Sequence, residues 1–485
     1  MKLLSEILTS TEVLSFTASD QVQITGLTYD SRRVGKGDCF FAVRGTQSDG
    51  HNYIGKAIEA GAAAIVCEQL PEQLNGEVSY IVVRDTNSAM ADIAAAYYDN
   101  PSHEINLVGV TGTNGKTTVA TLLYDLYRKM GYRAGLISTV IYRIDEQEIP
   151  STHTTPDAIR LNAMLREMVD RGCEYCFMEV SSHSLVQDRV RGLKFRGAMF
   201  TNLTHDHLDY HGTFVEYIRA KKLLFDSLPK SAFALVNADD RNGDVMVQNT
   251  RARIARYSLR TLADYHAKLL EMHFDGMLLR LDSYDVWVQF LGRFNAANLL
   301  CVYGTAMELG ADREQVLQAM SALHSVSGRF EPVRSKSGIT AIVDYAHTPD
   351  ALKNVITTIN DIRHANNRLI VVCGCGGDRD RTKRPKMGEI ASTDADIAIF
   401  TSDNPRSESP EDILDEMMQG VVASARVLRI TDREQAIDTA VMLAEAGDII
   451  LVAGKGHETY QIVGTERRHF DDREQLRKAF SKMNK

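Results

Sequence analysis

The chain has 485 residues, 44% hydrophobic and 25% charged, and a net charge of −9. This length predicts two to four domains, and the acidic balance argues against a general nucleic-acid binder. The sequence has no apolar run of about 18 residues and no N-terminal leader pattern, so we expect a cytoplasmic protein without a membrane partner. Seven cysteines scattered through so long a chain predict reduced thiols rather than a disulfide framework.

The first of three α/β blocks ends near residue 100, where Asn100-Pro101-Ser102 interrupts the pattern. Apolar runs and helical spacing alternate within it. They predict strands at 37–43, 62–66 and 80–83, and helices at 53–59 and 88–98. We therefore expect residues 1–100 to form one domain.

A glycine-rich turn at 109–118 reads GVTGTNGKTT and opens the second block, expected over 101–327. It lies between an apolar strand and a segment with helical spacing, where backbone N–H groups and the helix dipole favour a phosphate. Lys116 would reach the outer phosphates of ATP, and the Thr117 hydroxyl would bind Mg²⁺. The strict P-loop pattern requires glycine at position 110, which is Val110, so this turn is a variant. The alternative is a glycine turn without a ligand.

Glu179 follows the predicted strand 175–178, at the end where an α/β sheet carries its active site. A carboxylate there can hold Mg²⁺ opposite Thr117, although the motif alone also fits an ordinary capped loop. Residues 204–212 follow the predicted strand 198–201 and contain three histidines and two aspartates. They suggest a metal or phosphate site, with Mg²⁺ favoured over zinc, while solvated surface charge is the alternative.

Lys221 lies on the predicted helix 214–228, beside Lys222. A helical lysine is usually solvated, so its spacing alone predicts no site. Two further helical patterns, at 295–309 and 314–323, close the second block.

The third block, expected over 328–485, alternates apolar strands with helical patterns, which predicts a doubly wound sheet. Its strands are expected at 340–343, 369–373, 397–400 and 448–452. Three dense loops follow strands, at 372–385, 401–408 and 454–458. Together they could bind a zwitterion, with arginines for a carboxylate and Asp403 and Glu458 for ammonium groups.

Taken together, the motifs resemble those of the Mur ligases. In chain order from residue 111 to 461 they read TGTNGKTT, EVSSHSLVQDRV, NLTHDHLDYHG, GRFNAANLL, GRFEPV, VDYAHTPDAL, GCGGDRDRTKRP, TSDNPRSE and GKGHETYQ. The first block adds YDSR at 29–32 and GTQSDG at 45–50, so the resemblance spans nearly the whole chain. It implies three α/β domains: a UDP-substrate domain, a central P-loop-type ATPase domain with a parallel-rich sheet, and a C-terminal Rossmann-like doubly wound domain. It also explains the variant phosphate loop, since TGTNGKT is the family's own form.

The resemblance implies a role for each matching position. For ATP these are Gly112, Thr113, Asn114, Gly115, Lys116, Thr117, Thr118, Asn298, Arg329 and Asp344. For two Mg²⁺ ions they are Thr117, Glu179, His207 and Lys221, the lysine being carbamylated; Lys116, His207 and Lys221 are the implied catalytic residues. For the UDP-muramoyl-dipeptide they are Ser31, Thr154, Thr155, Ser181, Gln187 and Arg189. For the incoming amino acid they are Arg379, Asp403, Asn404, Pro405, Arg406, Gly454 and Glu458.

The activity implied is that of the family members that add the third residue of the peptidoglycan stem peptide. ATP phosphorylates the free D-glutamate carboxylate, and the amine of the incoming amino acid attacks the acyl phosphate. Arg406, after Asp403-Asn404-Pro405, favours meso-diaminopimelate over L-lysine, because an arginine can bind the extra carboxylate through two hydrogen bonds. The substrates would be small molecules, and we expect a monomer.

Three alternatives stay open at this stage. Folylpolyglutamate synthetase resembles the same ATPase core, but lacks a UDP-binding block matching residues 1–100 and the DNPR loop. A sister ligase that adds L-lysine differs at the 403–406 loop. A nucleotide-regulated binding protein without turnover belongs to a different functional class.

Overall fold

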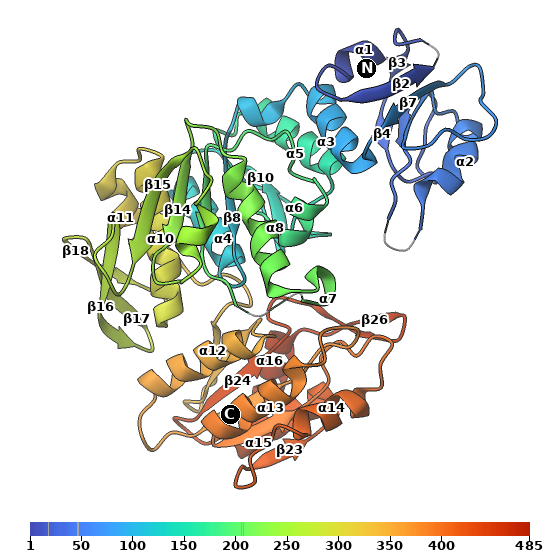
Figure 1. Cartoon of the computed structure of the whole chain (residues 1–485). Coiled ribbons are helices and arrows are strands. Elements are labelled where there is room, and N and C mark those ends of the chain that lie inside the picture. Colours follow the sequence, from blue (N-terminus) through green and yellow to red (C-terminus); the bar gives the residue numbers. More distant parts are fainter. Residues whose placement is uncertain (18, 46–47, 205, 207) are drawn as a thin grey trace.

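The computed structural model describes residues 1–17, 19–45, 48–204, 206 and 208–485. Three α/β bodies follow one another, with the N-terminal body (blue) at one end, the C-terminal body (orange to red) at the other and the central body between them (Figure 1). In the ranges described, no helix has the length and apolar character needed to cross a bilayer. All seven cysteines are free and buried, which confirms the expectation of reduced thiols.

The N-terminal body is built on a five-stranded sheet ordered β2-β7-β6-β5-β4, in which only β2 is antiparallel to its neighbour. Its strands are β2 (Val13–Thr17), β4 (Leu27–Thr28), β5 (Cys39–Phe41), β6 (Ala64–Cys67) and β7 (Ser79–Val83). A small sheet pairs β1 (Lys2–Leu3) with β3 (Gln23–Ile24). The helices of this body are α1 (Leu4–Ile7), η1 (Gly50–Tyr53), α2 (Ile54–Glu59) and α3 (Thr86–Tyr97). The predicted strands and helices are confirmed with small shifts at their ends. The sequence reasoning missed β1 to β4.

The central body has an eleven-stranded sheet ordered β11-β10-β9-β12-β8-β13-β14-β15-β16-β17-β18. Its middle, from β9 to β16, is parallel, and antiparallel hairpins extend it at both ends. The strands are β8 (Asn106–Thr111), β9 (Ala134–Ile137), β10 (Ile141–Ile144), β11 (Gln147–Pro150), β12 (Tyr175–Glu179), β13 (Gly197–Phe200), β14 (Phe233–Asn237), β15 (Arg253–Ser258), β16 (Tyr265–His273), β17 (Gly276–Leu281) and β18 (Tyr284–Val288). The parallel-rich sheet is confirmed, and the hairpins are additions to it.

Helices cover both faces of this sheet because neighbouring residues of its buried strands point to opposite sides. Val108 belongs to one core cluster, with residues of α4, α10 and α11, whereas Leu107 belongs to another, with residues of α5, α6 and α8. The helices are α4 (Lys116–Lys129), α5 (Ala158–Asp170), α6 (Ser182–Val186), α7 (Leu208–His211), α8 (Phe214–Asp226), α9 (Gly243–Met246), α10 (Arg293–Glu308) and α11 (Arg313–Ser321); η2 (Pro101–His103) precedes β8. The helices predicted after the phosphate loop and at 214–228, 295–309 and 314–323 are confirmed as α4, α8, α10 and α11.

The C-terminal body has a six-stranded sheet ordered β19-β20-β24-β21-β22-β23, parallel except for the edge strand β19. Helices α12 to α14 pack on one face and α15 and α16 on the other, so the predicted doubly wound sheet is confirmed. The strands are β19 (Glu331–Arg334), β20 (Thr340–Asp344), β21 (Leu369–Cys373), β22 (Ile397–Phe400), β23 (Val427–Arg429) and β24 (Ile449–Ala453), and a hairpin of β25 (Tyr460–Val463) and β26 (Glu466–His469) follows. The helices are α12 (Pro349–Ile362), α13 (Lys383–Asp394), α14 (Pro410–Met418), α15 (Arg433–Leu443) and α16 (Asp472–Lys482).

Candidate active site

The phosphate loop joins β8 to α4 and requires glycine at two positions. Gly112 has φ +147°, and a Cβ there would lie 2.0 Å from Thr201 Oγ1; Gly115 has φ +89°, and a Cβ there would lie 2.5 Å from Asn298 Oδ1. Val110 is a fully buried residue of β8, paired with Glu179 of β12. The departure from the strict P-loop pattern therefore falls in the strand, before the turn itself.

Two lysines converge on one carbonyl of this loop. Lys116 Nζ donates to Gly112 O and to Thr113 O, each at 2.9 Å, and Lys221 Nζ donates to the same Gly112 O at 2.8 Å. Lys221 is 1% exposed and lies 4.6 Å from the centre of the Tyr217 ring, so it is not the solvated residue that a helical lysine usually is. Burial, and next the neighbouring Lys116, hold the pKa of Lys221 well below its usual value.

Glu179 ends β12 and is 1% exposed. Its Oε1 accepts from the backbone N–H of Thr139 at 2.7 Å and its Oε2 from Thr139 Oγ1 at 3.1 Å. Thr139 Oγ1 lies 3.0 Å from Thr154 Oγ1, and Thr155 Oγ1 donates to Glu179 O at 2.8 Å. The carboxylate is thus held in one orientation beside the two threonines expected at the UDP-substrate site.

A cavity of about 1140 Å³ lies between the central and C-terminal bodies. It is lined by seventeen of the residues expected at the site: Thr113, Asn114, Gly115, Lys116, Thr117, Thr118, Thr154, Thr155, Glu179, Ser181, Arg189, Lys221, Asn298, Arg329, Asp344, Arg379 and Glu458. Its size suits a nucleotide together with part of a second substrate.

Other expected residues are not part of this wall. Among the described residues, these are Gly112, Gln187, Ser31, Asp403, Asn404, Pro405, Arg406 and Gly454. Gln187 is nonetheless tied to the wall, because its Oε1 accepts from Arg189 Nε at 3.0 Å while Arg189 Nη1 donates to Thr155 O at 2.8 Å. Ser31, partly buried, follows β4 in the N-terminal body, and His207 lies outside the described residues.

The C-terminal body contacts the phosphate loop directly. Arg329 Nη2 donates to Thr117 Oγ1 at 3.1 Å, and Asn114 Nδ2 donates to Asp350 Oδ2 at 3.1 Å. Asp344, at the end of β20, accepts from the backbone N–H of Phe330 at 2.7 Å. Burial raises the pKa of Asp344 to about 6, with Arg329 acting in the opposite direction.

The loops of the C-terminal sheet form a second polar group. Asn404 Nδ2 donates to Glu458 Oε2 at 2.8 Å, and Lys455 Nζ lies 3.2 Å from both Asn404 Oδ1 and Glu458 Oε2. Burial, and next the nearby Asp403, raise the pKa of Glu458. Gly454 has φ +114°, and a Cβ there would lie 2.5 Å from Asp403 Oδ2, so only glycine allows these two loops to approach.

Sequence reasoning missed Thr139, Asp350 and Lys455. The sequence around Asp350 indicates the start of a helix, because acidic residues are favoured in a first turn such as that of α12. It does not indicate the hydrogen bond to Asn114, which is 236 positions away. No local pattern indicates a role for Lys455, because a lysine between two glycines reads as an exposed turn, whereas its side chain is fully buried.

Family models match three parts of the chain: "Mur ligase family, catalytic domain" at 23–98, "Mur ligase middle domain" at 110–306, and "Mur ligase, glutamate ligase domain" at 328–456. UDP-N-acetylmuramoyl-L-alanyl-D-glutamate--2,6-diaminopimelate ligase of Bacteroides thetaiotaomicron is 53% identical over 99% of this chain and 100% of its own length. The relative of the same name from Chlorobaculum tepidum is 45% identical over 95% of this chain and 93% of its own length. A solved structure of such a ligase has 33% identity and a TM-score of 0.71, covering 100% of this chain and 99% of that one. The chain belongs to the Mur ligase family.

Proposed function

We propose that the chain is an ATP-dependent ligase that joins meso-diaminopimelate to the D-glutamate of UDP-N-acetylmuramoyl-L-alanyl-D-glutamate, a step of peptidoglycan synthesis. The observation that carries the proposal is the cavity whose wall includes the phosphate loop, Glu179, Arg379 and Glu458. Residues suited to bind phosphate, Mg²⁺ and an amino acid therefore line one cavity. We further propose that its domains are residues 1–100, 101–327 and 328–485.

The nucleotide is ATP in this proposal, bound by the phosphate loop and the start of α4. The loop and Asn298 are packed so closely that a Cβ at position 115 would lie 2.5 Å from Asn298 Oδ1. Arg329 and Asp344 approach the same space from the C-terminal body. The ATP site is then complete only when the two bodies are together, which favours closure around the substrates.

The donor set fits Mg²⁺. Thr117 and Glu179 offer hard oxygen atoms, and Mg²⁺ is usually held by one or two carboxylates together with substrate phosphates. Over the described residues, no cluster of three or more His, Cys, Asp or Glu could hold a metal ion without help. We propose two Mg²⁺ ions, held by Thr117, Glu179, His207 and Lys221, which would neutralise phosphate charge during phosphoryl transfer.

Lys221 can contribute to this set only as an anion, because an ammonium group would repel Mg²⁺. Its neutral amine would react with CO₂ to give a carbamate and a proton. The lowered pKa of Lys221 supports this reaction, since only the unprotonated amine is a nucleophile. Carbamylation would also place an anion, instead of a second cation, beside Lys116 at the Gly112 carbonyl.

The reaction then has two steps. A D-glutamate carboxylate oxygen takes the terminal phosphoryl group of ATP and ADP leaves, giving an acyl phosphate. The amine of the amino acid attacks the acyl carbon, the new C–N bond replaces the bond to phosphate, and inorganic phosphate and a proton are released. Lys116 offsets charge on the transferring phosphate, and enclosure by the two bodies keeps water from the acyl phosphate.

For the UDP-linked dipeptide we propose Ser31, Thr154, Thr155, Ser181, Gln187 and Arg189. Thr155 Oγ1 accepts from the backbone N–H of Ser181 at 3.2 Å, so these residues form one hydrogen-bonded surface beside Glu179. Ser31 lies two residues from Tyr29, whose pKa is raised by burial and then by Asp157 and lowered by Arg189. Asp157 and Arg189 of the central body are therefore close enough to the turn that carries Ser31 to affect the pKa of Tyr29.

The three-substrate requirement tests this function. Phosphate release from ATP is measured with each of the UDP-dipeptide, meso-diaminopimelate and Mg²⁺ omitted in turn. The proposal expects release only in the complete mixture, together with one UDP-tripeptide per phosphate by mass spectrometry. Release without the amino acid would indicate another reaction, and no release at all would favour a binding protein without turnover.

Replacement of Arg406 by alanine or lysine is expected to raise the KM for meso-diaminopimelate on the order of 10- to 100-fold, because the substrate's distal carboxylate loses a two-point donor. In the described part of the chain no carboxylate lies within ion-pair distance of the Arg406 guanidinium, and only Nη1 is engaged, with Gly377 O at 2.7 Å. The remaining donors suit an anionic ligand. Initial-rate kinetics over a range of meso-diaminopimelate concentrations make the measurement.

Arg429→Ala is the matched control for this change. Arg429 lies on β23 of the same sheet and is paired with Glu411 and Asp415 at the surface. Its loss should leave the KM for meso-diaminopimelate unchanged. An Arg406→Ala variant with the KM of the unaltered protein would remove Arg406 from the amino-acid site.

ATP affinity is expected to weaken as the pH falls through about 6, because protonated Asp344 no longer attracts Arg329, the arginine that contacts Thr117 at the start of α4. The raised pKa of Asp344 places this titration above the range of an ordinary aspartate. The dissociation constant for ATP should be measured between about pH 5 and 7.5 in the protein and in Asp344→Asn. ATP itself titrates in this range, so the expected signature is a difference between the two curves. Parallel curves would contradict the role of Asp344.

A further inference from the structure

Two loops that carry amino-acid residues in the proposed function are packed against each other along their backbones. The first follows β21 and contains Arg379, and the second follows β22 and contains Arg406. Gly377 N donates to Asn404 O at 2.9 Å, and a Cβ at Gly377 would lie 1.9 Å from Pro405 O. The position of one arginine therefore depends on how the loops are held together.

A buried guanidinium lies behind this junction. Arg384, in the first turn of α13, is fully buried and binds Glu408 at two points, with Nη1–Oε2 and Nη2–Oε1 distances of 2.8 Å. Its Nη1 also donates to Glu416 Oε2 at 2.9 Å, and its Nη2 to Gly376 O at 3.4 Å. The two-point bond to Arg384 lowers the pKa of Glu408 to about 2, so this carboxylate is ionised at neutral pH.

Glu408, held by Arg384, also binds the first loop, because its Oε1 accepts from the backbone N–H of Asp378 at 2.5 Å. The Asp378 carboxylate in turn accepts from Ser407 Oγ at 2.6 Å and from Ser407 N at 3.3 Å. Asp378 and Arg406 both have left-handed backbones, with φ +52° and +51°. Each loop therefore supplies a carboxylate that holds the other in a conformation non-glycine residues rarely adopt.

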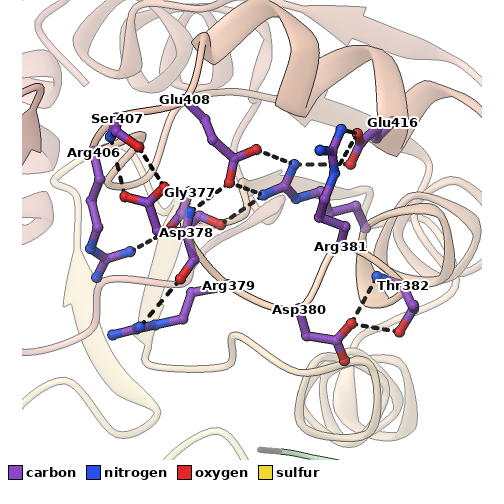
Figure 2. A network of polar contacts seen from close by, with 12 residues as sticks. Gly377, Asp378, Arg379, Asp380, Arg381, Thr382, Arg406, Ser407, Glu408 and Glu416 are labelled. Carbon is purple, nitrogen blue, oxygen red and sulfur yellow. Dashed lines mark hydrogen bonds and ion pairs between the residues drawn. The ribbon is translucent and has the colours of Figure 1, made fainter. Parts of the chain in front are cut away.

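Both arginines are attached to this junction through backbone carbonyls. Arg406 Nη1 donates to Gly377 O at 2.7 Å, and Arg379 Nη1 donates to Asp378 O at 3.3 Å. Figure 2 shows their side chains extending to the same side of the network, away from Glu416. Over the described ranges, neither guanidinium forms an ion pair with a carboxylate. Hydrogen bonds from Ser407, and to a smaller extent the charge of Arg406, lower the pKa of Asp378, so Arg406 interacts with this carboxylate only from beyond ion-pair distance. The network thus fixes two cationic groups and leaves them available to an anion.

We propose that Arg384, Glu408 and Asp378 are positioning residues that set the separation of Arg379 and Arg406, and so the preference for an amino acid with a carboxylate at its far end. None of the three is placed against substrate. The inference rests on the proposed function. A binding constellation needs its groups held to within about 0.5 Å, and outer hydrogen-bond partners supply that restraint.

Ser407 offers the mildest test, because it is exposed and its hydroxyl provides one link of the network. Ser407→Ala removes the bond to Asp378, whereas Ser407→Thr keeps a hydroxyl. We expect the KM for meso-diaminopimelate to rise roughly tenfold in the alanine variant and to stay within about twofold in the threonine variant. The KM values for ATP and for the UDP-dipeptide should not change in either.

Glu408→Gln and the double variant Arg384→Met/Glu408→Leu test the ion pair between the buried Arg384 guanidinium and Glu408. Replacing both members of a buried ion pair by apolar groups can preserve stability, whereas removing one leaves an unpaired charge. We expect both variants to lose meso-diaminopimelate preference over L-lysine by at least about tenfold. Asp438→Asn is the control, since Asp438 pairs with Lys482 at 2.7 Å on helices of the opposite face.

The outcomes distinguish failure of the proposed function from failure of the positioning role of Arg384, Glu408 and Asp378. Failure of the unaltered protein and of Asp438→Asn to ligate meso-diaminopimelate would overturn the proposed function and the inference with it. Normal ligation by these two, with an unchanged KM and unchanged preference in Ser407→Ala and the double variant, would overturn the inference alone. A parallel rise of all three KM values would also overturn it, because a general loss of structure affects every substrate. If Glu408→Gln does not fold, the Ser407 pair decides.

Discussion

Ligation is expected to fall on the order of 10²- to 10³-fold when Lys116 is replaced by alanine, with the fold intact. Lys116 stands at the start of α4, and its amine hydrogen-bonds two carbonyls of the phosphate loop. Burial lowers its pKa, so a bound phosphate would be needed to offset the cost of a charged amine there. Without that amine, negative charge on the transferring phosphate is less well neutralised. Single-turnover product formation at saturating ATP makes the measurement.

Lys129→Ala is the control for this change. Lys129 ends the same helix and is exposed, so its loss should affect neither rate nor thermal midpoint. A Lys116→Ala variant that turns over like the Lys129→Ala variant would contradict the role of the phosphate loop.

Lys221→Ala is expected to abolish ligation, and added formate or acetate is expected to restore part of it. The small carboxylate would replace the carbamate in the space that the lysine side chain leaves. Rescue is the decisive part, because removal of a buried side chain alone would also reduce activity through a cavity. Mass spectrometry of the intact unaltered protein, kept in bicarbonate, should also show the added mass of one CO₂.

Lys222→Ala separates this effect from a general loss of positive charge on α8. Lys222 is the next residue and pairs with Asp226 at 2.5 Å, so we expect near-normal turnover without any response to carboxylates. Near-normal turnover of Lys221→Ala, or a loss that no carboxylate relieves, would contradict the carbamate.

The buried parallel strands could be predicted from the sequence because they are continuous apolar runs. β21 and β24 are fully buried along their length, and each was expected within a residue. The hairpin β16 to β18 was missed because its strands alternate buried and exposed residues over a sheet edge, and its middle strand contains Arg280. Such a mixture of apolar and polar residues indicates a strand only weakly.

The loops of the candidate site could be predicted from the sequence, since most chemically dense segments follow strands. Glu179, Arg379 and Glu458 lie where strand ends predicted them, on one cavity. Burial of single charges could not be predicted, because it depends on partners far away in the chain. Lys221 is buried against Gly112 and Tyr217, and Arg384 against Glu408 and Glu416, and no local pattern distinguishes these from surface residues.

The central claim is that this chain ligates meso-diaminopimelate to the UDP-dipeptide at the expense of ATP. The most direct measurement is a competition in which meso-diaminopimelate and L-lysine are present at equal concentration and the UDP-tripeptide products are identified by mass. The account predicts that the diaminopimelate product dominates and requires ATP, because lysine leaves Arg406 without its anion. A dominant lysine product, or no ATP-dependent product from either amino acid, would contradict it.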